Sequence, residues 1–353
     1  MRIAILLTLF AASILAGDAN IESLIDNEHW KRAREAAQSM YQAHPNDAHV
    51  VCLLARIRHE FGNLAEAVKL AESGVRLDPK SSACHRELGE ALADQAEKVS
   101  FLKQIGLARK IHPEFDAALA LAPKDPDNIF DQIQYLEEAP GIVGGDKKKA
   151  AQLANELLTI DKTRGYLALA YLARKEKDET RLEGLYQKAV ESNPRNHEAQ
   201  MTLAAYYVNS KQPNFSAAEQ HARAALDLNP DRVNAYRLLA YVLVVQKHID
   251  EAARIVARAE SAVPDDLSPA VYIARAMLRD NVELPKAEAY LKKYLNETKE
   301  PEPSSPSLTN AHWILGLVYE KEGRIPEARS ELETALKLKP DFEPAKRDLK
   351  RLK

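Results

Sequence analysis

Residues 315–340 read LGLVYEKEGRIPEARSELETALKLKP, and this stretch decides the fold. Leu315 and Gly316 place a large residue beside a small one, as in a first helix, and Ala328 and Ala335 recur at the spacing of a second helix that ends before a proline. A unit of two helices cannot bury its own apolar face, so it has to stack on copies of itself. The stretch therefore predicts an all-α solenoid of stacked helix pairs without a single central core.

The same order of residues returns about every 34 residues along the chain. Prolines that follow a helix with small residues on one face are Pro45, Pro79, Pro194, Pro230, Pro264 and Pro340. Large-small pairs of the preceding first helices are Leu54–Ala55, Leu88–Gly89, Leu169–Ala170, Leu203–Ala204 and Leu239–Ala240. Small side chains that share one helix face allow the partner helix to approach closely, so the repeat predicts helix pairing over most of the chain.

These residues resemble the tetratricopeptide repeat family, whose pattern is W-x2-L-G-x2-Y, then A-x3-F-x2-A and a late proline. In residues 312–340, His312 occupies the tryptophan position and Leu332 the phenylalanine position. The resemblance implies a right-handed superhelix of antiparallel helix pairs whose first helices line a concave groove. We expect about nine units over residues 20–342, the first of them partial, and a capping helix over residues 343–353.

Two insertions interrupt the period. The first lies near residues 94–123, where Pro113 offers an alternative interpretation because it follows Pro79 by one period and could close a regular unit. The second lies at residues 137–150, EEAPGIVGGDKKKA. Its glycines invite a phosphate-binding interpretation, but the spacing GxxxxGK[ST] is absent, which favours an ordinary long turn. The two insertions together resemble a group of exported bacterial tetratricopeptide-repeat proteins whose role is undefined.

Residues 1–19 read as a cleavable export signal. Arg2 precedes an apolar run over residues 3–16, and small residues follow it. The run is short for a membrane span, although an uncleaved anchor is the alternative. Asp18 stands where a lipoprotein would need cysteine, so a lipid anchor is not expected. No later segment is apolar enough to span a membrane, and we expect a soluble protein exported to the periplasm or secreted.

The composition excludes several functional classes. A formal net charge of -3 gives no general attraction to nucleic acid. No HExxH, GxSxG or CxxC spacing occurs, so we predict no catalytic residues, no metal site and no cofactor. An enzyme with its site at the turn from Gly141 to Lys149 is a further alternative, which would need a bound ligand or ion there.

Cys52 and Cys84 lie on the first helices of neighbouring units. Export to an oxidising compartment permits a disulfide. Their separation, however, is two residues short of the period, and two residues turn a helix by about 200°, so the two positions are not equivalent. On this geometry we expect two buried or half-buried thiols in preference to a disulfide.

The inner surface of the first helices is the expected binding site. Family register places these residues toward the groove: Arg86, Tyr171, Arg174, Arg237, Tyr241, Tyr272, Arg279 and Trp313. Tyrosine, tryptophan and arginine are favoured at binding hot spots, although each could instead pack against a neighbouring helix. We expect a non-catalytic scaffold, adaptor or assembly factor that binds a protein or peptide segment in the groove of a bacterial periplasmic protein. The alternative is a binder of cell-wall glycan or a small ligand that uses the same aromatic residues.

Overall fold

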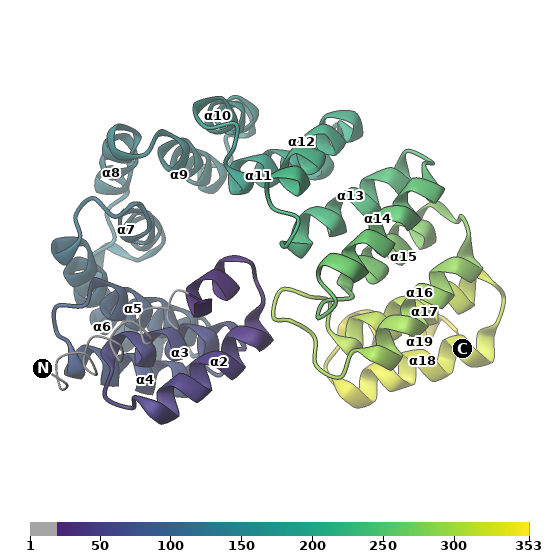
Figure 1. The fold of residues 1–353 in the computed structure, drawn as a ribbon, viewed down its shortest axis with the longest axis horizontal. Coiled ribbons are helices and arrows are strands. Elements are labelled where there is room, and N and C mark those ends of the chain that lie inside the picture. Colours follow the sequence, from purple (N-terminus) through teal and green to yellow (C-terminus); the bar gives the residue numbers. More distant parts are fainter. Residues whose placement is uncertain (1–19, 353) are drawn as a thin grey trace, which may run out of the picture. The chain divides into compact units, whose positions relative to one another are not determined.

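The computed structural model describes residues 20–352, without the side chains of residues 101 and 102, and the regular elements in this range are helices (Figure 1). The predicted signal segment, residues 1–19, lies outside the described residues. The chain divides into two compact units, which we call the N-terminal unit, up to Asn193, and the C-terminal unit, from Pro194 onward. Among the described helices, none is long and apolar enough to cross a membrane.

The N-terminal unit begins with helical residues 20–26, and its further helices follow one another with short connections. They are α2 (Trp30–Ala43), α3 (Ala48–Glu60), α4 (Leu64–Leu77), α5 (Ser82–Glu97), α6 (Phe101–Leu121), α7 (Pro126–Glu138), the 3-10 turn η1 (Gly141–Val143), α8 (Lys147–Ile160), α9 (Lys162–Lys175) and α10 (Glu179–Ser192).

The C-terminal unit continues the alternation of first and second helices. Its helices are α11 (His197–Asn209), α12 (Phe215–Leu228), α13 (Val233–Val245), α14 (Ile249–Ala262), α15 (Ser268–Asp280), α16 (Leu284–Glu297), α17 (Leu308–Lys321), α18 (Ile325–Leu338) and α19 (Glu343–Arg351). The last of these, α19, packs on α18.

Within each unit, every first helix pairs with the second helix that follows it and also contacts the next first helix. In the N-terminal unit α3 packs on α4 and on α5, and in the C-terminal unit α13 packs on α14 and on α15. The prediction of an all-α solenoid built from stacked helix pairs is confirmed (Figure 1).

Small residues and prolines set this geometry, as the repeat predicts. On α12, Ala218, Ala222 and Ala225 are fully buried, so the backbone of this helix lies close to its neighbours. The prolines stand two residues beyond the last residue of α2, α4, α10, α12, α14 and α18. A proline cannot continue a helix without losing a backbone hydrogen bond, so it fixes where each second helix ends.

Several of the turns between paired helices contain a residue with positive φ. Gly62 has φ +73° and Gly323 has φ +77° at this turn, and Lys177 and Lys247 adopt φ of 60° and 69° at the corresponding position of other pairs. Only glycine takes up this conformation without strain, so the two lysines carry a local cost that the surrounding helix packing sustains.

Pro113 does not close a regular unit, so the alternative interpretation of the first insertion was wrong. It lies inside α6, a helix of 21 residues. Ile111 and Phe115, on either side of the proline, are buried against α5 and α7. Because this apolar face stays packed through the proline, the helix tolerates the loss of one backbone hydrogen bond.

The connection from α16 to α17, residues 298–307, is longer than the other connections of the C-terminal unit. It contains the run PEPSSPS at residues 301–307. We did not predict this third irregularity, although three prolines within six residues were its signal.

Cys52 and Cys84 form a disulfide between α3 and α5, with Cα atoms 5.4 Å apart. The expectation of free thiols was therefore wrong. Equivalent positions on two parallel neighbours point in the same direction, whereas a bridge needs side chains that face each other. The two-residue shift between Cys52 and Cys84 rotates one side chain about half a turn around its helix, so that the two side chains face each other. Gly74 of α4 leaves room for the bridge, because a Cβ atom at this position would overlap the Sγ atom of Cys52.

Candidate binding surfaces on the first helices

One candidate site lies in the N-terminal unit, where the two insertions meet. A pocket of about 520 Å³ is formed by α3, α5, α6 and α7 together with the turn at residues 139–143. Neither insertion makes this pocket alone, since α6 supplies one wall and the turn supplies another. We call it the insertion pocket.

Tyr135 of α7 holds the two insertions together. Its hydroxyl donates to the carbonyl oxygen of Ala108 on α6 at 3.2 Å and to that of Val143 in the turn. Its ring stacks on His112, with ring centroids 5.2 Å apart. Burial raises the pKa of Tyr135 to about 12, so the hydroxyl keeps its proton and the bridge persists at physiological pH. Hydrogen bonds and ring stacking of Tyr135 therefore hold the wall of the insertion pocket in place.

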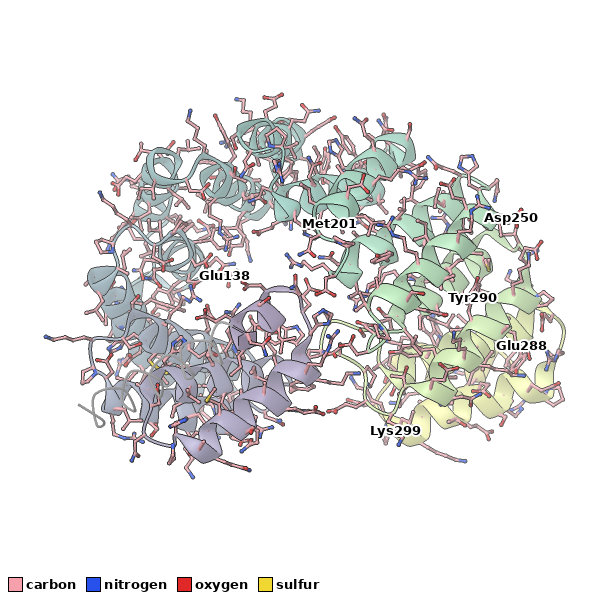
Figure 2. The ribbon with its side chains drawn as sticks, in the orientation of Figure 1. Glu138, Met201, Asp250, Glu288, Tyr290 and Lys299 are labelled. Atoms are coloured by element: carbon pink, nitrogen blue, oxygen red, sulfur yellow. A yellow bond between two sulfur atoms is a disulfide. The ribbon has the colours of Figure 1, made fainter. Side chains whose placement is uncertain are left out.

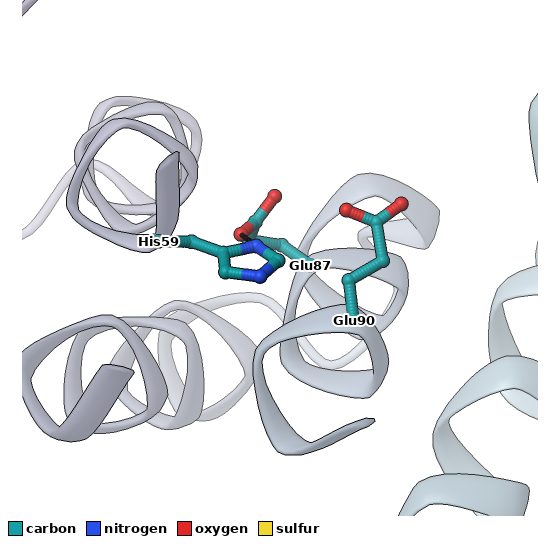
Figure 3. A group of neighbouring side chains, drawn as sticks. All are labelled: His59, Glu87 and Glu90. Atoms are coloured by element: carbon teal, nitrogen blue, oxygen red, sulfur yellow. Dashed lines mark ion pairs between the residues drawn. The ribbon is translucent and has the colours of Figure 1, made fainter. Parts of the chain in front are cut away.

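His59 of α3 lines the insertion pocket and lies between two carboxylates of α5, Glu87 and Asp94, of which Figure 3 shows Glu87. Its Nδ1 is 3.3 Å from Oε1 of Glu87, and its Nε2 is 3.0 Å from Oδ2 of Asp94. Burial alone would lower the pKa of His59, but the two carboxylates outweigh it and raise the pKa to about 9. At neutral pH this imidazole is a cation that is already paired.

The ligating atoms of His59, Glu87 and Glu90 lie within 4.8 Å of one another, close enough for a metal ion by distance (Figure 3). We predicted no metal site from the sequence, because these residues form no spacing motif. Both ring nitrogens of His59 face a carboxylate, and a metal would have to displace one of these pairs. The arrangement is explained by a buried ion pair.

Glu90 of α5 and Asp131 of α7 also line the insertion pocket, and Glu90 lies beside His59 and Glu87. Their shared cation is Arg86, whose Nε is 3.6 Å from Glu90 and 3.9 Å from Asp131. Burial, followed by the nearby carboxylate of Glu90, raises the pKa of Asp131 to about 9. At these distances the single guanidinium of Arg86 makes only weak ion pairs with the two carboxyl groups.

Three of the predicted groove residues lie in the N-terminal unit, and each has a partner there. Arg86 also pairs with Asp127 at 3.4 Å. The Tyr171 hydroxyl donates to Glu138 at 2.6 Å, and the Arg174 guanidinium contacts the hydroxyl of Tyr186 on α10. Figure 2 shows Glu138 at the end of α7, on the side away from α8. Arg86 and Tyr171 thus border the insertion pocket through their acidic partners, whereas Arg174 points toward a second helix.

Arg237 is buried in the C-terminal unit and does not reach an open surface. Its Nη2 donates to Asp266 at 2.6 Å and to Ser305 at 2.7 Å, and its Nη1 donates to the carbonyl oxygen of Ser304 at 3.2 Å. The prediction that Arg237 faces a partner assumed regular helix connections. The long 298–307 connection covers this side chain instead.

Tyr272 and Trp313 come together at a pocket of about 370 Å³ between α15, α17 and the 298–307 connection. The indole Nε1 of Trp313 donates to Asp348 of α19 at 2.8 Å, and the side chain is partly exposed. Arg275 lies exposed at the same pocket. We call this site the aromatic pocket.

Tyr241 and Arg279 also come together, on neighbouring first helices α13 and α15. The Arg279 guanidinium contacts the Tyr241 hydroxyl and lies 5.2 Å from the centre of its ring. The side chain of Arg279 is 43% exposed, so this pair remains accessible. Sequence reasoning found these residues but missed His59, Glu90 and Asp131; the signal for Glu90 was the acidic face of residues 87–97.

Comparisons with known proteins place the repeat in a family. A tetratricopeptide repeat model matches residues 24–97 and 212–278, and a second tetratricopeptide repeat model matches residues 309–342. Tetratricopeptide repeat protein 7B from mouse and from human is 31% identical over 145 residues, or 38% of this chain. The match spans 16% of the length of these relatives.

Solved structures with a similar fold include the following two. Yeast Tom70 aligns with a TM-score of 0.47 and 15% identity over 97% of this chain and 88% of its own. Pseudomonas aeruginosa pilF aligns with a TM-score of 0.42 and 17% identity over 64% of this chain and 99% of its own. The family models, matched on the stacked helix pairs described above, show that the chain belongs to the tetratricopeptide repeat family.

Proposed function

We propose that this chain binds segments of partner proteins on the surface of its first helices, as a non-catalytic adaptor or assembly factor. Membership of the tetratricopeptide repeat family indicates a scaffold for protein-protein interaction. A solenoid suits this role because each added pair of helices extends the same surface.

The observation that carries the proposal is the insertion pocket. At about 520 Å³ it is large enough for one or two side chains of a partner, and the first helices α3, α5 and α7 line it together with α6 and the turn. Its walls depend on both departures from the repeat. Insertions that only lengthened connections would not need to converge on one place, so their convergence supports a selected binding role.

The aromatic pocket supports the same function in the C-terminal unit. Tyr272 and Trp313 offer rigid rings at low entropic cost, and the aromatic side chains are partly exposed. The accessible pair of Tyr241 and Arg279 adds a polar contact on the same set of helices.

We place the protein in a bacterial periplasm. The predicted signal segment motivates this proposal, and the disulfide between Cys52 and Cys84 supports it, because such bonds persist in oxidising compartments. Amino-terminal sequencing of the mature chain, expected to begin near residue 20, tests the export. A mature protein that still begins at Met1 and fractionates with the cytoplasm would contradict it.

Selection of a displayed random heptapeptide library on the full chain tests the binding function. Enriched peptides are expected to bind the wild type and to bind Tyr272→Ala and Trp313→Ala less well, if they use the aromatic pocket, or Glu90→Gln less well, if they use the insertion pocket. Tyr290→Ala is the matched control, since Tyr290 lies on the second helix α16 (Figure 2).

Absence of any enriched peptide would refute the proposed function. Loss of binding in Tyr290→Ala, with full binding in the first-helix variants, would instead move the site to the other face of the stack.

A further inference from the structure

The insertion pocket has an excess of carboxylates. Its lining includes Glu90, Asp94, Glu97, Asp131 and Glu138. The cationic group in the same lining is His59, which is committed to Glu87 and Asp94. Glu138 is likewise committed, to Lys175 and to the Tyr171 hydroxyl. Glu90 and Asp131 are paired less closely, with Arg86 at 3.6 and 3.9 Å, and these two groups could take a further cation.

Asp131 is the most informative of these groups. Its side chain is 14% exposed, and its Oδ2 atom is buried without a hydrogen-bond partner. A buried acceptor left in this state costs about 1–3 kcal/mol, and more if it is charged. Glu90 beside it and Asp127 further along α7 add negative charge, and Arg86 at 3.9 Å offsets only part of it. With its pKa raised to about 9 by burial and by Glu90, Asp131 keeps its proton at neutral pH until a cation closer than Arg86 approaches.

The rest of the lining is apolar. Ile111 and Phe115 of α6, Tyr135 of α7 and Val143 of the turn contribute hydrophobic surface. A ligand that fits has a charged head and an apolar stem. Arginine and lysine side chains have this form, because their methylene groups pack on apolar surface while the charge stays at the tip.

We propose that the insertion pocket receives a basic side chain of a partner segment, preferably arginine, with its guanidinium between Glu90 and Asp131 and its stem against the apolar wall. This inference rests on the proposed function and names the chemistry of the partner. Arginine is preferred over lysine because a planar fork can donate to two carboxylates at once.

A divalent metal ion is the competing occupant. Its ligands would be His59, Glu87 and Glu90, which lie close together. A metal site, however, needs neither the apolar wall nor a pocket of about 520 Å³, and it makes no use of Asp131. The basic side chain accounts for all three features.

The test uses the heptapeptides enriched on the full chain. The enriched set is expected to share an arginine or lysine beside an apolar residue, and replacing arginine by its neutral isostere citrulline is expected to weaken binding roughly 10- to 100-fold. Glu90→Gln should reduce affinity for the arginine peptide by a similar factor, and Asp131→Asn should reduce it less, because Asp131 already holds a proton at neutral pH. Both are near-isosteric changes, and Asp131→Asn imitates the protonated carboxyl, so the fold is expected to survive. Circular dichroism and thermal melting check this.

Glu156→Gln is the matched control, because it removes one negative charge from an exposed position of α8 in the same unit. It should leave the affinity within about twofold, as expected for a distant screened charge. Enriched peptides without a basic residue, or equal binding of the citrulline peptide, would overturn the inference while the proposed function stands. Calorimetry with zinc chloride alone completes the test: zinc binding that depends on Glu90 would assign the cluster to a metal and also overturn the inference. A library with no enriched peptide would refute the proposed function, and this inference with it.

Discussion

Arg237 of α13 and Asp266, two residues before α15, form a buried ion pair with Nη2 and Oδ2 2.6 Å apart. Asp266 also accepts hydrogen bonds from the Ser268 amide and the Ser305 hydroxyl, both at 2.8 Å. Burial alone would raise the pKa of Asp266, but Arg237 and these donors hold it below its usual value. The pair joins two first helices to the connection that walls the aromatic pocket.

Replacing Arg237 by methionine should destabilise the protein by about 3–5 kcal/mol, because it leaves a buried carboxylate without its cation. Urea unfolding followed by circular dichroism measures the change. The exposed Arg254→Met on α14 is the control and should shift stability by less than about 0.5 kcal/mol.

The double variant Arg237→Met/Asp266→Asn should recover part of the loss, because the buried charge is removed as well. Equal stability of Arg237→Met and Arg254→Met would show that the network contributes nothing. A double variant no better than Arg237→Met would show that the buried charge is not the cause.

Reduction of the bond between Cys52 and Cys84 should lower stability by about 3–4 kcal/mol, as loop-closure entropy predicts for a separation of this size. The free energy of unfolding is measured with and without dithiothreitol. The paired variant Cys52→Ala/Cys84→Ala should be insensitive to the reductant, and an equal response from both proteins would contradict the assignment.

Gly74→Ala tests the same disulfide by filling the space that its sulfur atoms occupy. A Cβ atom at Gly74 would overlap the sulfur of Cys52 and lie 3.0 Å from that of Cys84. We expect incomplete oxidation of this variant, visible as thiols that react with an alkylating reagent after unfolding. The exposed Gly184→Ala of α10, where a Cβ meets nothing within 4 Å, should oxidise fully.

The acidic insertion pocket should make stability fall as pH rises. His59 has a folded pKa raised to about 9, so its stabilising contribution is full below an unfolded pKa near 6.5 and is lost as pH passes 9. Asp131 has a pKa raised from 3.8 to about 9, so its contribution to stability falls progressively as pH rises from 3.8 to 9. Both effects therefore have the same sign between pH 6.5 and 9.

Melting temperatures of the wild type at pH 6 and pH 9.5 measure this change, and His59→Gln/Asp131→Asn should show a smaller decrease. A wild-type melting temperature that rises over this interval would contradict the assigned pKa directions. An unchanged decrease in the double variant would place the titrating groups elsewhere.

The fold was predictable because its signals are local. Alanines such as Ala222, and a proline two residues after most second helices, specify one pair of helices at a time, and stacking repeats this pairing along the chain. The disulfide was mispredicted because Cys52 and Cys84 were compared as equivalents, while a bridge depends on which sides of two helices face each other.

The candidate site was harder to predict because it depends on how the irregular segments pack against the regular helix pairs. A regular register placed Arg237 at the surface, but the 298–307 connection buries it. The insertion pocket needs α6 and the 139–143 turn to meet at Tyr135, a contact between residues 27 apart in sequence that no periodicity describes. The paired residues Tyr241 and Arg279 were found because both lie in regular repeats.

Lys177→Gly should stabilise the protein by about 0.5–1 kcal/mol, because φ is 60° at this turn and only glycine adopts such a value without strain. Glycine already occupies the corresponding turn at positions 62 and 323. Thermal unfolding measures the effect, and Lys188→Gly on the exposed face of α10 is the matched control. The control should lose about 1 kcal/mol, since glycine disfavours a helix interior. A loss of stability in both variants would mean that the entropy of the unfolded chain outweighs the strain at Lys177.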